Sequence, residues 1–591
     1  MVWNEGRRKL LIDSIKNGLP IGAILLYKKG PGEKDEITEY QLIDGLQRVT
    51  TLKKYNDKPT DFYDENNLDP DFVVIVLKFL KNEIGLEISE DSIKRYLIEW
   101  IRSRTGFEET DGFSSSDLVR FIDEKIKDKF GKELEKKSLL KLIELVKPYL
   151  KRIKDESDIR DFEIPVIVYT GNPEELPIIF QRINSKGTQL NKYQIFAATW
   201  TAYDPIEIKN TEIIEKIKAK YEALIDEGLE IENYDPTTFY TSKFTYFEYL
   251  FGFGKLLAEK YPLLFKTTSP EHEADSIGFN IVAICLGHNL RKMETLPESL
   301  RKVDLNILEE KILEVVDFLD TILKPFIGIK ANKKSGTPFP VVHTEFQIVS
   351  LIGKIFKSKY KIDFVTNKIE ENENWTEKEE ALRKNIPYHY LYDIIKGFWS
   401  GTGDKKAMER ANSDWYEKPI DKESWESLLI EWHENEKNKK EKNRASINKV
   451  SVLFLKYIYT HLLTAHEELS STEFEVDHII PFARLRNIAR QIDGLPISAL
   501  GNLALIKKNL NRDKRDRTFY EYFDELVENG EITESQKDEE IKKIEKYTFT
   551  TREMLEFIKS LSTENIEDFY NYLDERFKRM REVFYKVNRI S

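Results

Sequence analysis

One tract near the end of the sequence, residues 474–517, restricts the possible folds more than any other feature. It opens with the apolar run 476–480, which predicts a short β-strand ended by Pro481. Asp477 and His478 interrupt that run. A strand with a purely structural role has no need of such a polar pair, so the tract also predicts chemistry.

The rest of the tract completes a small frame. The turn dipeptide Gly501-Asn502 precedes a second apolar run, 503–506, which predicts another strand. The polar stretch that follows favours a helix with Asn511 and Lys514 one turn apart on the same face. Strand, strand and helix can bring the polar side chains of all three parts around one point.

These residue types suit the hydrolysis of a phosphodiester. A neutral imidazole, that of His478, can take a proton from water near pH 7. Asp477 and Asn511 offer hard oxygen ligands, which favour Mg²⁺ or Mn²⁺. An ion held there would polarise the phosphate and neutralise charge on the leaving oxygen. Positive charge for a DNA backbone is predicted at Lys507, Lys508, Arg512, Lys514, Arg515 and Arg517.

The tract resembles the HNH (ββα-metal) nuclease motif, in the form Asp-His-Ile-x-Pro, Gly-Asn-Leu-x-Leu and Asn-x-x-Lys. This form is similar to the C-terminal domain of GmrSD-type, type IV restriction endonucleases. The resemblance implies a general base at His478 and metal ligands at Asp477 and Asn511. It also implies a loop-holding role for Asn502 and a catalytic place for Lys514. Asn511 stands where the motif's third letter is otherwise His, which argues for a hard ion rather than zinc.

Each part alone has a simpler interpretation. A lone Asp-His pair on a strand is usually a satisfied polar pair, and Gly-Asn is usually only a turn. All three parts in this order, followed by a basic helix, favour the nuclease.

Bulk composition limits the remaining possibilities. The chain of 591 residues is too long for one hydrophobic core and predicts three or four domains. Its net charge of −12 argues against a generally basic surface, so nucleic acid would bind through local patches. The single Cys285 excludes a disulfide framework and fits a reducing cytoplasm. No apolar run is long enough to span a membrane.

A second constellation lies near the N-terminus. The predicted strand 40–43 delivers Asp44 and Gly45 to the start of a predicted helix, an arrangement that resembles phosphate-binding geometry. Arg48, one turn into the helix, could fork onto a phosphate; the simpler alternative is a strand-turn-helix with a surface arginine. Further strands are predicted at residues 21–27, 72–80 and 162–169, and helices over most of residues 87–160.

This constellation looks like the Asp-Gly-Gln-Gln-Arg-x-Thr-Thr-Leu signature of the GmrSD N-terminal domain. That domain has a ParB/sulfiredoxin-like fold, and the family binds and hydrolyses a nucleoside triphosphate there. Residues 180–190 resemble the family's second signature, Phe-x-Arg-x-Asn-x-x-Gly-x-x-Leu. The resemblance assigns nucleotide binding to Asp44, Gly45, Gln47, Arg48, Arg182 and Asn184. The chain departs from the family where Leu46 replaces a Gln, and where Trp3 stands almost at the start.

The remaining sequence predicts helices and little chemistry. Apolar residues at helical spacing predict helices at 206–226, 244–258, 277–291, 307–323, 345–356, 425–438, 447–463, 520–528, 551–560 and 563–588. The dense aromatic residues of 234–253 are expected to form core rather than a base-stacking platform. The last predicted helix carries Arg576 among several basic residues, which favours a solvated face over a secondary DNA contact.

These features together predict an α+β protein that is mostly helical. A ParB/sulfiredoxin-like α/β domain is expected at residues 1–205, a helical middle domain at 206–400, and an HNH nuclease within a helical domain at 401–591. The predicted function is a cytoplasmic, metal-dependent DNA endonuclease of prokaryotic anti-phage defence, regulated by a nucleotide and directed at modified phage DNA. Alternatives are a phosphorothioate-sensing nicking nuclease and a nucleotide-responsive DNA sensor that needs a partner, either a second copy or another defence protein.

Overall fold

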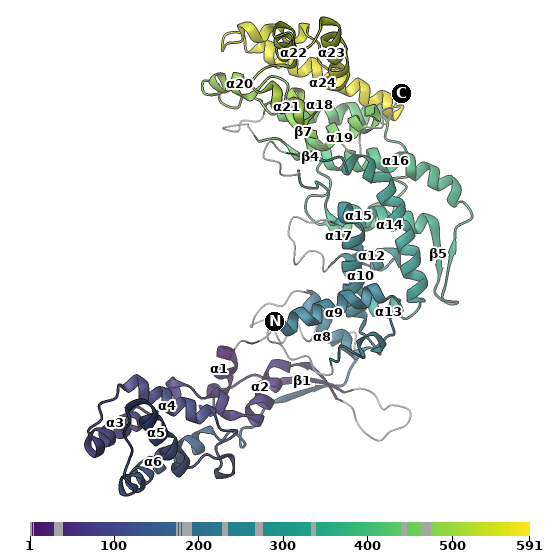
Figure 1. Cartoon of the computed structure of the whole chain (residues 1–591). Coiled ribbons are helices and arrows are strands. Elements are labelled where there is room, and N and C mark those ends of the chain that lie inside the picture. Colours follow the sequence, from purple (N-terminus) through teal and green to yellow (C-terminus); the bar gives the residue numbers. More distant parts are fainter. Residues whose placement is uncertain are drawn as a thin grey trace. The chain divides into compact units, whose positions relative to one another are not determined.

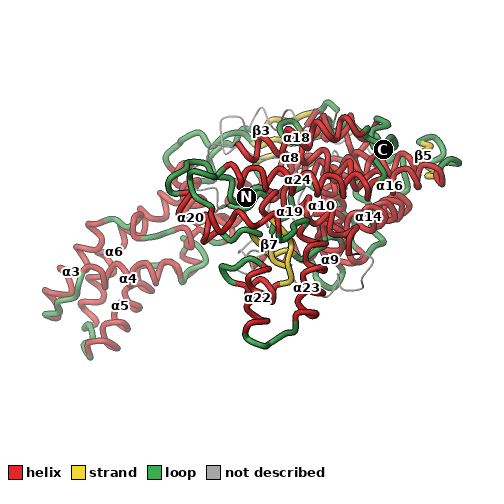
Figure 2. The backbone as a smooth tube through the Cα atoms, turned by 90° about the horizontal axis from the view of Figure 1, so that it is seen from above, coloured by secondary structure: helices red, strands yellow, loops and turns green. Residues whose placement is uncertain are grey.

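The computed structural model divides the chain into two compact units, Met1–Ala202 and Tyr203–Ser591 (Figure 1). Helices dominate both units, and the strands are few and short (Figure 2). This agrees with the prediction of a mostly helical α+β protein. The structure describes residues 3, 5–28, 40–172, 175–176, 179, 192–226, 234–265, 276–332, 339–438, 446–463 and 474–590.

The N-terminal unit contains a three-stranded sheet of order β2-β1-β3. Its strands are β1 (Ile24–Lys28), β2 (Tyr40–Asp44) and β3 (Val166–Tyr169). Strand β1 pairs antiparallel with β2 and parallel with β3. The strands predicted at residues 21–27, 40–43 and 162–169 are therefore confirmed, each within a few residues at its ends.

Helices make up the rest of this unit: α1 (Glu5–Lys16), α2 (Leu46–Asp57), α3 (Pro70–Ile84), α4 (Glu90–Arg102), α5 (Ser115–Phe130), α6 (Lys136–Ser157) and α8 (Lys192–Thr199). Helices α3 to α6 share a core in which Phe72, Trp100 and Leu142 are fully buried. That core is separate from the small cluster of Leu25 and Ile43 under the sheet.

The strand predicted at residues 72–80 is wrong, because these residues form helix α3. The side chain of Asp69 accepts a hydrogen bond from the Asp71 amide at the start of α3, and Pro70 takes the first helical position. Gly85 ends the helix in the left-handed conformation, with φ +58°. These capping residues, and burial on one face, outweigh the β-propensity of the Val and Ile residues between them.

The first part of the C-terminal unit is helical, as predicted. Its longer helices are α9 (Thr211–Asp226), α10 (Tyr246–Lys260), α12 (Ile277–Cys285), α14 (Leu305–Ile327), α15 (Glu345–Lys359), α16 (Trp375–Ile395) and α17 (Gly403–Asn412), with a hairpin of β5 (Tyr360–Asp363) and β6 (Lys368–Glu371). Aromatic residues of α10 such as Tyr249 and Phe253 are buried, so the expectation that they form core is confirmed.

The last part of the unit surrounds a second small sheet, of order β4-β7-β8. Its strands are β4 (Ala331–Asn332), β7 (Phe474–His478) and β8 (Leu503–Lys507); its helices are α18 (Lys422–Asn438), α19 (Lys449–Leu463), α20 (Phe482–Ala489), α21 (Lys508–Lys514), α22 (Phe519–Glu528), α23 (Glu534–Thr548) and α24 (Glu567–Asn588). Helix α23 was not predicted, and the helix predicted at 551–560 is the 3₁₀ helix Glu553–Ser560. Strand β4 lies before residue 400 but pairs with β7, which lies after it. The domain boundary predicted at residue 400 stays a prediction.

Among the described residues, every helix is too short or too polar to cross a lipid bilayer.

Candidate functional site

The tract 474–517 contains the predicted strand, strand and helix, with α20 and a short 3₁₀ helix, Leu500–Asn502, between the two strands (Figure 1). Strand β7 pairs antiparallel with β8, which places Asp477 opposite Ala504 and His478 opposite Leu503. Helix α21 follows β8 directly and packs against both strands. The predicted secondary structure of the tract is therefore confirmed.

The turn that leads into β8 is held by a close approach to helix α24. A Cβ atom on Gly501 would lie only 2.7 Å from the carbonyl oxygen of Leu573 on that helix, so no larger residue fits without a shift of the backbone. The glycine of the Gly-Asn pair is thus required by packing, and its φ angle is not positive.

Asn502 uses its whole amide group to hold the chain that follows His478. Its Oδ1 accepts a hydrogen bond from the Ile480 amide at 2.9 Å, and its Nδ2 donates to the carbonyls of Ile480 and Ile497. The side chain is fully buried. This is the loop-holding geometry that the resemblance implied, and it places Asn502 as a positioning residue; its effect on catalysis stays a prediction.

Arg576, on helix α24, supports the same turn. It is fully buried and donates to the carbonyls of Leu500, Gly501, Leu503 and Thr548. The expectation that Arg576 lies on a solvated face or contacts DNA is therefore wrong. No local pattern in the sequence links it to a turn more than 70 residues earlier.

Asp477 and Lys514 form a buried ion pair at the centre of the frame. Lys514 Nζ lies 2.7 Å from Asp477 Oδ2, and the two side chains are 1% and 6% exposed. The contact is an ion pair rather than an aligned hydrogen bond. One oxygen of Asp477, the predicted metal ligand, is therefore paired with the ammonium group of Lys514.

A neighbouring pair, Glu475 and Asn511, was only half predicted. Asn511 Nδ2 donates to Glu475 Oε2 at 2.9 Å, and both residues are buried. Among the residues that the structure describes, Glu475 Oε1 and Asn511 Oδ1 have no hydrogen-bond partner. The sequence analysis missed Glu475, although its position two residues before Asp477 puts both carboxylates on the same face of β7.

The chemistry of this group fits a hard divalent cation. Two carboxylates and one ammonium leave the buried cluster with an excess negative charge, and the remaining guanidinium, of Arg512, is 3.9 Å from Glu475 Oε1. Each buried acceptor without a partner costs roughly 1–3 kcal/mol. Asp477, Asn511 and Glu475 supply only oxygen donors, which suit Mg²⁺ or Mn²⁺ and not zinc.

His478 lies next along β7, at the end of the strand, and is partly exposed. Its Nε2 is 2.9 Å from the hydroxyl of Ser498, a buried residue that the sequence analysis did not identify. Such a hydrogen bond fixes the orientation of the imidazole. Ser498 lies in an irregular segment, so no periodic pattern could have identified it.

The basic residues of the tract divide into two groups. Lys507, Arg512 and Arg515 are exposed and Lys508 is half-buried, so their charges can reach a ligand from solution. Arg517 instead pairs with Glu525, and it also donates to the carbonyls of Asp513 and Lys514. Its guanidinium thus closes the end of α21.

The N-terminal turn also follows its predicted secondary structure, because β2 ends at Asp44 and α2 begins at Leu46. Gly45 has φ +103° and gives the first turn of α2 no side-chain cap. The Oε1 of Gln47 accepts a hydrogen bond from the Trp3 amide.

Arg48 is bound within its own unit. Its guanidinium donates to Asp44 Oδ2 at 2.7 Å and to the carbonyls of Ile21 and Ala23. A Cβ on Gly22 would lie 2.9 Å from Arg48 Nη1, so this glycine makes the approach possible. These contacts favour the structural interpretation of Arg48. Arg182 and Asn184 lie outside the described residues.

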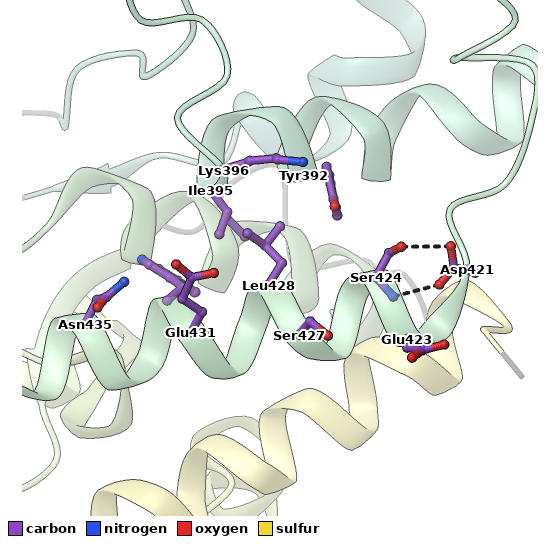
Figure 3. Close-up of a pocket in the computed structure, with 11 residues that line it drawn as sticks. Tyr392, Ile395, Lys396, Asp421, Glu423, Ser424, Ser427, Leu428, Glu431 and Asn435 are labelled. Atoms are coloured by element: carbon purple, nitrogen blue, oxygen red, sulfur yellow. Dashed lines mark hydrogen bonds between the residues drawn. The ribbon is translucent and has the colours of Figure 1, made fainter.

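A pocket of about 850 Å³ lies between α16 and α18 (Figure 3). It contains none of the predicted site residues, and its lining includes three carboxylates, of Asp421, Glu423 and Glu431, against the single ammonium of Lys396. Such a lining repels phosphate, so this groove does not suit DNA.

His433, Glu434 and Asp574 also lie close enough together for a metal ion. Lys437 already lies within this group, with its Nζ 2.8 Å from Asp574 Oδ1 and 2.9 Å from Glu434 Oε1. The side chains of Glu434 and Asp574 are about half exposed, so water and the ammonium can satisfy their charge, and the group does not call for a metal ion as the buried carboxylates of Glu475 and Asp477 do.

Comparison with known families gives a match for the N-terminal third of the chain. Residues 1–201 match the N-terminal domain of GmrSD restriction endonucleases. The resemblance found at the Asp44–Leu52 signature is thereby confirmed for this part of the chain. No curated protein matches the chain.

Proposed function

Because residues 1–201 are a GmrSD-type N-terminal domain, we propose that the chain is a DNA endonuclease of prokaryotic defence whose cutting site is the strand–strand–helix of β7, β8 and α21. The observation that supports this most directly is the pair of buried oxygens of Glu475 and Asn511, which have no hydrogen-bond partner in the part of the chain that the structure describes. An excess of buried acceptors is what a site for a divalent cation requires.

In the proposed mechanism each residue of the frame has the role that the resemblance to the HNH motif implies. Asp477 and Asn511 would hold Mg²⁺ or Mn²⁺, which would polarise the scissile phosphate and stabilise charge on the leaving oxygen. His478 takes a proton from a water molecule, whose oxygen attacks phosphorus. The bond from phosphorus to the 3′-oxygen breaks, which yields a 5′-phosphate and, after protonation, a 3′-hydroxyl.

Positioning comes from the protein itself. Asn502 and Arg576 fix the turn and loop on either side of His478, so the imidazole keeps its place when substrate arrives. The ammonium of Lys514 would lie beside the phosphate once a cation shares Asp477. The exposed Lys507, Arg512 and Arg515, with Lys508, would bind the DNA backbone.

The N-terminal turn would bind a nucleoside triphosphate that regulates the cut. The first turn of α2 follows Gly45 without a side-chain cap, which leaves room for an anion at the helix N-terminus. Gln47 lies in that first turn, while Asp44 and Arg48 hold the turn against β1. The preferred target would be modified phage DNA.

The decisive experiment is plasmid cleavage by the purified full chain. Unmodified DNA and phage-derived DNA with modified bases are incubated with Mg²⁺ or Mn²⁺, with and without nucleotide. We expect His478→Ala to lower the rate by at least about a hundredfold, as for loss of a general base. His461→Ala, which removes an exposed histidine on α19, serves as the matched control and should cut like the parent.

The pattern of products separates the alternatives. Cutting by the parent that persists in His478→Ala would contradict the assigned site. Nicked circles from phosphorothioate DNA alone would favour the nicking enzyme, and DNA binding without any cut would favour a sensor that needs a partner.

A further inference from the structure

The hydrogen bond between Glu475 and Asn511 determines which way the asparagine amide faces. A carboxylate can only accept, so the atom of Asn511 that lies 2.9 Å from Glu475 Oε2 must be the NH₂ nitrogen. The amide oxygen then faces away from Glu475. It is buried and has no hydrogen-bond partner among the described residues.

Glu475 shows the same feature on its own second oxygen. The residue is 1% exposed, and its Oε1 has no hydrogen bond from any described residue. The guanidinium of Arg512, 3.9 Å away, is at the limit of an ion pair and largely exposed. A glutamate that served only to pack against Asn511 would not leave this oxygen buried without a hydrogen bond.

Strand geometry brings these oxygens toward the predicted metal ligand. Glu475 and Asp477 are two residues apart on β7, so both side chains leave the same face of the strand. Helix α21 lies against that face, as the contacts of Asn511 with Glu475 and of Lys514 with Asp477 require.

We propose that Glu475 is a positioning residue of the metal site, which fixes the amide of Asn511 with its oxygen toward the cation and adds negative charge beside Asp477. The proposal rests on the proposed function, because the cation is the one that Asp477 and Asn511 would hold. It assigns a role to a residue outside the motif letters.

The test measures Mn²⁺ binding by electron paramagnetic resonance on the full chain without DNA, so the readout does not depend on cleavage. Glu475→Gln removes the charge and lets either amide turn over, and we expect the dissociation constant for Mn²⁺ to rise at least about tenfold. Glu521→Gln, which removes another half-buried carboxylate of this region from its pair with Arg484, is the matched control and should change it less than about twofold.

A reversed pair provides the rescue. In Glu475→Gln combined with Asn511→Asp, the Gln amide donates to the new carboxylate, so an oxygen again faces the cation and the charge of the pair is restored. We expect the double variant to bind Mn²⁺ within about threefold of the parent. Binding by the double variant as weak as that of Glu475→Gln would overturn the proposal, as would parental binding by Glu475→Gln.

Asp477→Ala separates failure of the inference from failure of the proposed function. Loss of Mn²⁺ binding in Asp477→Ala together with parental binding in Glu475→Gln would overturn only the role of Glu475. No Mn²⁺ binding by the parent, or equal binding by Asp477→Ala, would overturn both. Circular dichroism of every variant confirms that the fold is retained.

Discussion

The two candidate sites, the turn before α2 and the frame of β7, β8 and α21, differ in the hydrogen bonds that their polar atoms make. At the start of α2, the guanidinium of Arg48 is bound by one carboxylate and two backbone carbonyls of its own unit. In the frame of β7, β8 and α21, one oxygen each of Glu475 and Asn511 is buried with no hydrogen-bond partner within the described ranges. Both turns resemble family signatures in sequence.

A signature alone therefore does not separate residues that hold the fold from residues that bind a ligand. Donors that are hydrogen-bonded within the fold, as both Nη atoms of Arg48 are, stabilise the folded chain by themselves, although Arg48 Nε is buried without such a bond among the described residues. Unpaired buried acceptors destabilise it until a cation binds, so a ligand that supplies the missing partner also raises stability. This difference makes the C-terminal frame the stronger candidate for a ligand site.

The largest effect is expected at Arg576, whose guanidinium donates to backbone carbonyls like that of Arg48 but lies beneath the C-terminal frame. Arg576→Met leaves the carbonyls of Leu500, Gly501, Leu503 and Thr548 without their buried donor. We expect the free energy of unfolding, from urea titration of the full chain, to fall by roughly 3–5 kcal/mol.

Arg579→Met is the control on the same helix, because Arg579 is partly exposed and pairs with Glu575 at the surface. Its loss should stay under about 0.5 kcal/mol. Arg576→Lys keeps one ammonium donor and should fall between the two. A parental urea midpoint for Arg576→Met would show that the turn does not depend on the buried guanidinium.

Arg576 also marks the limit of prediction from sequence. The strands and helix of the tract 474–514 could be predicted, because alternation, Pro481 and the turn dipeptide are local signals. The turn's support from α24 could not, since it depends on packing between residues far apart in the chain. Glu475 is an intermediate case. Its spacing of two residues from Asp477 is a local signal, but Glu475 is not one of the residues of the HNH motif.

Helix α3 shows the same limit for secondary structure. Its run of Val and Ile residues favoured a strand, but its buried residues Phe72, Val76 and Phe79 recur at helical spacing. Asp69-Pro70 before the run and Gly85 after it are capping signals that indicate a helix rather than a strand.

The second prediction uses histidine to separate the two units. All eight histidines lie in residues 203–591, and none lies in residues 1–202. Burial lowers the pKa of His343 to about 4 and that of His389 to about 4. At these two side chains the unfolded state binds more protons than the folded state between about pH 4 and 6.5, so their contribution to stability falls as the pH falls through this range. The carboxyl of Asp393, whose pKa burial raises to about 7, contributes in the opposite direction.

At pH 5 each of the two histidines should cost the C-terminal unit about 2 kcal/mol relative to pH 7.5. Pulse proteolysis in a urea series, with cut sites mapped by mass spectrometry, reports each unit separately. The double variant His343→Gln/His389→Gln should lose most of this pH dependence. An equal loss of stability in residues 1–202 would contradict the assignment to histidine.

The smallest effect is expected at Arg48, and it tests the comparison most directly. If Arg48 holds β1 to α2, Arg48→Ala should destabilise residues 1–202 by about 2 kcal/mol in the same proteolysis assay. Arg95→Ala, at an exposed site on α4 of the same unit, should change stability by less than about 0.5 kcal/mol. Binding of a fluorescent nucleotide to Arg48→Ala should then weaken only at temperatures at which residues 1–202 unfold. Binding should return when the sample is cooled and the unit refolds. Lost nucleotide binding at parental stability would instead make Arg48 a direct ligand, and the two turns would no longer differ in kind.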